Sequence, residues 1–61
     1  MYTVTILYQR DGGSAQKECR TMAEVERYLS VMLPGADWLC YEVVDGEGEV
    51  VKHQDRRRFY A

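Results

Sequence analysis

Alternating apolar and polar positions predict a strand over residues 2–8. Every second side chain from Tyr2 is aromatic or β-branched, and the side chains between are mostly polar, which is the period of two that a half-buried strand shows. Asp11-Gly12 is typical of a type I′ hairpin turn. We therefore expect residues 14–20 to pair back as a polar edge strand. The predicted partners are Tyr8 with Ala15, Ile6 with Lys17 and Val4 with Cys19.

The pattern changes to a helical one over residues 22–33. Thr21 and Glu24 have the spacing of a capping box, which marks a helix start. The apolar positions that follow recur at i, i+3, i+4, i+7 and i+8 and define one buried stripe, made of Val25, Tyr28, Leu29, Met32 and Leu33. Pro34 and Gly35 end the helix, because proline cannot continue the hydrogen-bond ladder and glycine permits the reversal.

A second hairpin is predicted for residues 38–44 and 49–54, around the turn Asp45-Gly46-Glu47-Gly48. Its register pairs Val43 with Val50, Glu42 with Val51 and Cys40 with His53. Since side chains alternate between the two faces of a sheet, two sets follow. Leu39, Tyr41, Val43 and Val50 are expected beneath the helix, whereas Trp38, Cys40, Glu42, Val44, Val51 and His53 are expected on the opposite face.

These elements predict a single α+β domain over residues 1–61, ordered strand, strand, helix, strand, strand. A four-stranded antiparallel sheet in the spatial order 14–20, 2–8, 38–44, 49–54 would carry the helix on one face and leave the other uncovered. That uncovered face would display Leu7, Trp38, Val44 and Val51. It is more apolar than the solvent face of a monomer usually is, which indicates a site for a partner.

Size and composition narrow the class of protein. A chain of 61 residues with 46% hydrophobic and 30% charged side chains is expected to fold around a small core, without room for a large catalytic cleft. Two cysteines allow at most one disulfide, and no basic leader or long apolar run is present. We therefore expect a cytoplasmic protein that does not associate with membranes.

Charge is distributed unevenly along the chain. Residues 21–50 carry seven carboxylates and one arginine, whereas residues 51–61 carry four cations and one carboxylate. This acidic middle and basic tail either pair with each other within the fold or face two different partners.

Catalysis and metal binding are weakly indicated. Cys40 and His53 are predicted cross-strand neighbours, and Glu42 or Asp55 could orient the imidazole, but a flat sheet face offers neither a pocket nor oxyanion donors. Cys19, Cys40 and His53 lack the closely spaced pairs of a zinc site, and the acidic turn is too short for a calcium loop. We predict no enzyme activity, no catalytic residues, no metal and no cofactor.

Binding residues are more strongly indicated. Arg56, Arg57 and Arg58 could bind phosphates while Phe59 and Tyr60 stack on bases, but the acidic middle would repel a polyanion, so a nucleic-acid ligand is the weaker hypothesis. Aromatic and arginine side chains also anchor protein interfaces. The predicted contact set is Trp38, Glu42, Asp45, Glu47, Glu49, Arg56, Arg57, Arg58, Phe59 and Tyr60.

The small size, the single capped helix on a small sheet and the acidic turn Asp45–Glu49 together resemble the inhibitor proteins that bacteriophages encode against host machinery, such as anti-CRISPR proteins. The resemblance covers the whole chain as a format and includes no diagnostic motif. It implies stoichiometric inhibition, in which an acidic or aromatic surface occludes a site on a host nuclease complex. The modest net charge of −2 argues against extensive DNA mimicry. The alternatives are a homodimerising or adaptor domain and a nucleic-acid-binding module.

Overall fold

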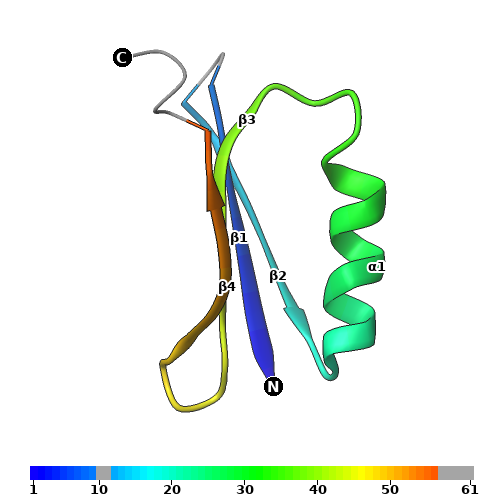
Figure 1. The fold of residues 1–61 in the computed structure, drawn as a ribbon, viewed down its shortest axis with the longest axis vertical. Helices are drawn as coiled ribbons and strands as arrows, with labels where there is room; N and C mark the ends of the chain where they lie inside the picture. Colours follow the sequence, from blue (N-terminus) through cyan, green and yellow to red (C-terminus); the bar gives the residue numbers. More distant parts are fainter. Residues whose placement is uncertain (10–11, 57–61) are drawn as a thin grey trace.

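The computed structural model describes residues 1–9 and 12–56. It contains β1 (Tyr2–Tyr8), β2 (Ser14–Cys19), α1 (Met22–Met32), β3 (Trp38–Val44) and β4 (Val50–Asp55). The strands form one sheet in the order β2-β1-β3-β4, and all neighbouring strands are antiparallel. The helix lies on one side of this sheet (Figure 1). The predicted α+β class, strand order and helix placement are confirmed.

Thr21 starts the helix as the capping box predicts. Its hydroxyl oxygen accepts a hydrogen bond of 3.2 Å from the backbone N–H of Glu24, and the Glu24 carboxylate accepts one of 3.0 Å from the backbone N–H of Arg20. The first bond satisfies one of the N–H groups that a helix start leaves unpaired, and the second reaches one residue past the N-cap Thr21 that a capping box would engage. At the other end Gly35 has a φ of +77°, which lets the chain reverse after Pro34.

The core lies between α1 and the sheet. Val25 and Leu29 are the buried residues of the helix. They pack in one cluster with buried side chains from three strands, namely Val4, Ile6, Cys19, Trp38, Tyr41 and Val43. The helix has its main contacts with β1 and β2, so the half of the sheet made of β3 and β4 is covered less. No helix in residues 1–9 and 12–56 has the length and apolarity needed to cross a membrane.

The register between β1 and β2 differs from the prediction by two residues. Ile6 lies opposite Ala15, Val4 opposite Lys17 and Tyr2 opposite Cys19. The reason is that the backbone N–H of Tyr8 donates to the carbonyl of Gly13, while the next N–H, that of Gln9, donates to the carbonyl of Asp37. The end of β1 is thus held by the segment before β3, and the hydrogen bond from Tyr8 to Gly13 replaces the predicted pairing of Tyr8 with Ala15. A shift of two keeps each side chain on its face.

A bulge between β1 and β3 moves Trp38 to the helix side. Leu7 lies opposite Cys40 but Tyr8 lies opposite Trp38, so Leu39 is an extra residue in β3. The prediction that Trp38 is displayed on the uncovered face is therefore wrong. Its side chain is 8% exposed, and its ring centroid is 5.5 Å from that of Tyr41. Leu39, which was expected in the core, is half-buried and outside the core cluster.

A second bulge changes the pairing of β3 with β4. Val44 lies opposite Val50, but Val43 lies opposite Lys52, so Val51 is the extra residue. None of the predicted pairs of this hairpin is present. The cause is a three-residue turn. The backbone N–H of Gly48 donates to the backbone carbonyl of Asp45, and the backbone N–H of Asp45 donates to the carbonyl of Glu49. Val50 is 50% exposed and does not join the core.

Candidate protein-binding surface

The side of the sheet turned away from α1 is named the open face here. The register places Thr3, Thr5 and Leu7 of β1 on it. Their partners in β2 and β3, and the β4 residues that pair with those of β3, lie on the same face; they are Ser14, Gln16 and Glu18 of β2, Cys40, Glu42 and Val44 of β3, and Val50, His53 and Asp55 of β4. Gln16 and Thr5 are joined across β1 and β2 by a hydrogen bond of 3.4 Å. The uncovered face that the sequence predicts is therefore present. Cys40, Glu42, Val44 and His53 lie on it as predicted, whereas Trp38 does not and Val50 joins it.

Charge divides between the two sides of the sheet. Among residues 1–9 and 12–56, the ionised side chains of the open face are the carboxylates of Glu18, Glu42 and Asp55. The cationic side chains lie on the helix side of the sheet, because alternation places them there; they are Lys17 of β2, Lys52 of β4 and Arg56 just beyond β4. Because alternation separates the two sets, the described part of the sheet presents an acidic surface although the net charge of the chain is only −2.

Contacts of the cationic side chains agree with this division. The ammonium of Lys17 is 5.9 Å from the ring centroid of Tyr28 on the helix, and the guanidinium carbon of Arg56 is 4.6 Å from the centroid of Trp38. These are cation–π distances. Burial raises the pKa of Tyr28 above its ordinary value of 10.0, and the nearby Tyr8 and Cys19 raise it further. The predicted contact residue Arg56 thus covers the buried tryptophan.

The turn between β3 and β4 extends the acidic surface. The Asp45 carboxylate accepts hydrogen bonds from the backbone N–H groups of Glu47, at 2.8 Å, and Glu49, at 3.0 Å. Gly48 has a φ of +84°, which a residue with a side chain rarely adopts. Asp45 therefore shapes the turn, and the side chains of Glu47 and Glu49 are exposed on it.

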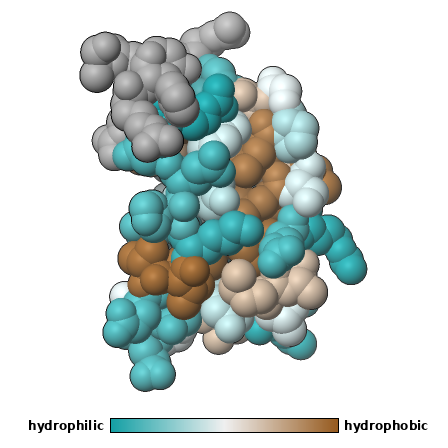
Figure 2. All heavy atoms as spheres, viewed as in Figure 1, coloured by the Kyte–Doolittle hydropathy of each residue, from teal (hydrophilic) through white to brown (hydrophobic). Residues whose placement is uncertain are grey.

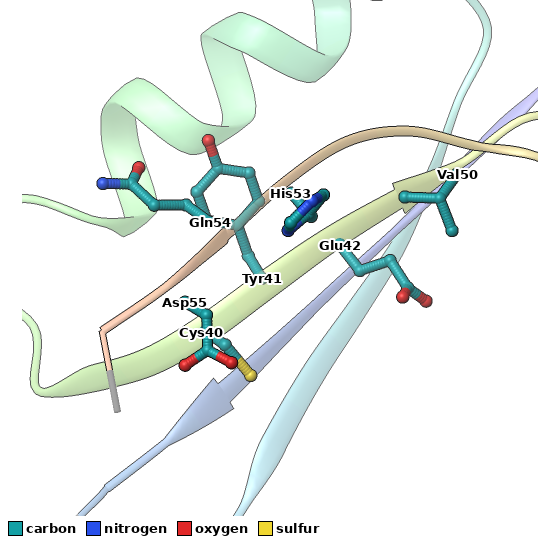
Figure 3. Close-up of a pocket in the computed structure, with 7 residues that line it drawn as sticks. All are labelled: Cys40, Tyr41, Glu42, Val50, His53, Gln54 and Asp55. Atoms are coloured by element: carbon teal, nitrogen blue, oxygen red, sulfur yellow. The ribbon is translucent and has the colours of Figure 1, made fainter. Parts of the chain in front are cut away.

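A hollow of about 510 Å³ lies on the sheet at β3 and β4. Figure 3 shows its residues, with Cys40 and Asp55 pointing away from the helix and Tyr41 and Gln54 pointing toward it. Asp55, not His53, lies opposite Cys40, and His53 lies opposite Glu42. The predicted direct Cys40–His53 pair is therefore wrong. The two residues are diagonal neighbours on adjacent strands, which are typically about 7–8 Å apart.

The lining of this hollow bears on metal binding. Within residues 1–9 and 12–56, no group of three or more His, Cys, Asp or Glu side chains is arranged to hold a metal ion. Both Cys19 and Cys40 are free thiols, and Cys19 is buried. The titratable side chains in the lining include the carboxylates of Glu42 and Asp55 and the imidazole of His53.

Apolar side chains accompany the carboxylates. Leu7 is 39% exposed in the middle of the open face, and Val50 and Val51 are 50% and 45% exposed at the start of β4. The space-filling view in Figure 2 shows an apolar patch over the β3–β4 hairpin, bordered by hydrophilic residues. An apolar patch with a charged border is the composition expected of a protein-binding surface.

The predicted contact set is thus redistributed. Glu42, Glu47 and Glu49 belong to the acidic surface, Trp38 is buried under Arg56, and the predictions for Arg57, Arg58, Phe59 and Tyr60 lie outside the described residues. Sequence reasoning missed Glu18 and Asp55 as parts of this surface, although alternation from Cys19 gives the face of Glu18. Comparisons with protein-family models, with curated proteins and with solved structures returned no match.

Proposed function

We propose that this chain is a non-enzymatic protein-binding inhibitor that docks through its open face and the turn Asp45–Glu49. The observation that carries the proposal is the separation of charge across the sheet, with Glu18, Glu42 and Asp55 on the open face and the strand cations on the other side. An acidic face with a few exposed apolar side chains complements a basic protein surface.

Basic protein surfaces commonly bind nucleic acids through their phosphates. A domain that covers such a surface with carboxylates would exclude the nucleic acid sterically and compete with its charge. This mechanism agrees with the resemblance to small phage-encoded inhibitors of the anti-CRISPR type, and we propose a nuclease or another nucleic-acid-handling complex as the target. The resemblance supplies the target class, and the charge separation supports the binding mode.

Two alternatives fit the same surface less well. Direct nucleic-acid binding through the open face would bring phosphates against Glu42 and Asp55. Face-to-face pairing of two copies would bring the carboxylates of both copies together, and like charges across an interface oppose association. A basic partner avoids both conflicts.

The test compares two charge reversals that change the net charge equally. Glu42→Arg changes a residue of the open face, and Glu26→Arg changes an exposed helix residue that does not belong to the open face. Wild type and both variants are immobilised, proteins captured from a host lysate are identified by mass spectrometry, and the purified partner is titrated against each variant. We expect Glu42→Arg to weaken binding at least about tenfold and Glu26→Arg to leave it unchanged.

The captured partner is then tested for competition. Labelled nucleic acid bound to the partner should be released when the wild-type protein is added and retained when Glu42→Arg is added. Equal binding by both variants, or a partner that holds its nucleic acid and this protein together, would refute the proposal.

A further inference from the structure

The outer edge of β4 has backbone groups directed away from the sheet. The N–H of Arg56 donates to the carbonyl of Leu39 at 2.8 Å. Because hydrogen-bonded pairs recur at every second residue of an antiparallel ladder, the pairs of Gln54 with Tyr41 and of Lys52 with Val43 are also hydrogen-bonded ones. In an antiparallel ladder the intervening residues direct their N–H and C=O groups outward. The backbone of His53 therefore points to the outer edge, because β4 is last in the strand order.

The helix leaves room beside this edge. A groove of about 330 Å³ separates the C-terminal half of α1 from β3 and β4 and is lined by Glu26, Leu29, Ser30, Leu33, Pro34, Tyr41 and Lys52. In Figure 2 an apolar strip is visible between the sheet and the helix. The other edge differs, because α1 lies over β2 (Figure 1) and Lys17 of β2 is already placed against Tyr28.

The two sides of β4 carry different charges. Lys52 and Arg56 lie on the helix side, where Lys52 borders the groove. Asp55 lies on the open-face side with Glu42 one strand further in. A strand laid along β4 would place alternate side chains on these two sides.

We propose that β4 accepts an extended segment of another protein as a fifth strand, and that this segment alternates basic residues with apolar or acidic ones. Its basic residues lie on the open-face side near Glu42 and Asp55. Its apolar or acidic residues lie on the helix side, at the groove and Lys52. Backbone hydrogen bonds to His53 hold the segment, and the alternation selects it, as in other cases of strand addition.

Charge argues against a second copy of this chain as the occupant. Antiparallel pairing of two β4 strands about a two-fold axis keeps the helix sides of both copies on one side of the joined sheet. Lys52 and Arg56 of both copies would then share that side, and the carboxylates of both would share the other. Like charges on neighbouring strands destabilise the pairing, so an added segment of opposite pattern is favoured.

The inference shares Glu42 and Asp55 with the proposed docking through the open face, but only strand addition involves the outward backbone of His53, so the two modes are distinguished at that amide. The probe is a synthetic peptide, acetyl-Arg-Leu-Arg-Glu-Arg-Leu-Arg-amide, and the control peptide has the same composition in the order Arg-Arg-Leu-Leu-Arg-Glu-Arg. Each is titrated into the ¹⁵N-labelled full chain, and amide shifts and hydrogen exchange are followed by NMR. The backbone N–H of Gln16, on the edge of β2, is the internal control.

We expect the alternating peptide to shift the His53 amide and to slow its hydrogen exchange, to leave Gln16 unchanged, and to bind at least about tenfold more tightly than the scrambled peptide. Lys52→Glu should weaken the binding, and a peptide with Lys in place of its Glu should restore it. His53→Pro removes the outward N–H without breaking a hydrogen bond between β3 and β4 and should abolish binding, whereas Gln16→Pro at the edge of β2 should not.

Three results would overturn the inference. These are equal binding of the two peptides, shifts confined to open-face side chains without protection of His53, and failure of the exchanged peptide to rescue Lys52→Glu. A concentration-dependent dimer in which the His53 amide is protected without any peptide would assign the edge to a second copy instead.

Discussion

Truncation of Trp38 tests the bulge that places this residue in the core. Its side chain is 8% exposed and contacts the ring of Tyr41, while the guanidinium of Arg56 covers it. An aromatic side chain buries about 150–250 Å², and its replacement by alanine in a core costs about 3–5 kcal/mol. A domain of 61 residues has a free energy of unfolding of about 3–9 kcal/mol. Trp38→Ala should therefore remove much or all of the stability.

The assay is urea denaturation followed by far-UV circular dichroism. Trp38→Phe, which keeps an aromatic ring in the core, should remain folded with an intermediate midpoint. Val51→Ala is the control at a residue that is 45% exposed, and it should change the free energy of unfolding by no more than about 1 kcal/mol. If Trp38→Ala were as stable as Val51→Ala, Trp38 would lie on the open face and the described register of β3 would be incorrect.

Three further predictions concern the cap, the turn and a tyrosine. Thr21→Ala should cost about 1 kcal/mol and lower the melting temperature by roughly 4–8 °C, as measured by calorimetry. Gly48→Ala should cost about 1–2 kcal/mol because of its positive φ, whereas Gly46→Ala, with only ordinary contacts near Met1, should cost less in the same urea assay. The raised pKa of Tyr28 means that the folded protein holds this proton more tightly than the unfolded chain, so stability should fall as pH rises above 10. Tyr28→Phe should show a smaller fall in alkaline titrations.

The sequence was sufficient to predict the strands and the helix whose apolar positions recur with a single period along their whole length. Residues 2–8 alternate without interruption, and Thr21 and Glu24 mark the helix start by their spacing, so the structure has both where they were expected. The strand order followed from connecting two hairpins through antiparallel neighbours. These features depend on local patterns, which are visible in a single chain.

The positions next to the bulges in β3 and β4 were not predictable in the same way. Each strand contains one extra residue, Leu39 in β3 and Val51 in β4, and neither bulge has a glycine or proline to mark it. A bulge reverses the alternation beyond it, which explains why Trp38 was assigned to the wrong side. The acidic face emerged only when the registers placed Glu18 and Asp55 together with Glu42.

The position of β1 between β2 and β3 has a consequence for the order of events during folding. The hairpin of β1 and β2 can form early because its strands are close in the sequence, but the second edge of β1 is satisfied only by β3, after the helix has been made. Long-range pairing of this kind slows folding. During synthesis, β1 would therefore remain open to incorrect partners until residues 38–44 have left the ribosome.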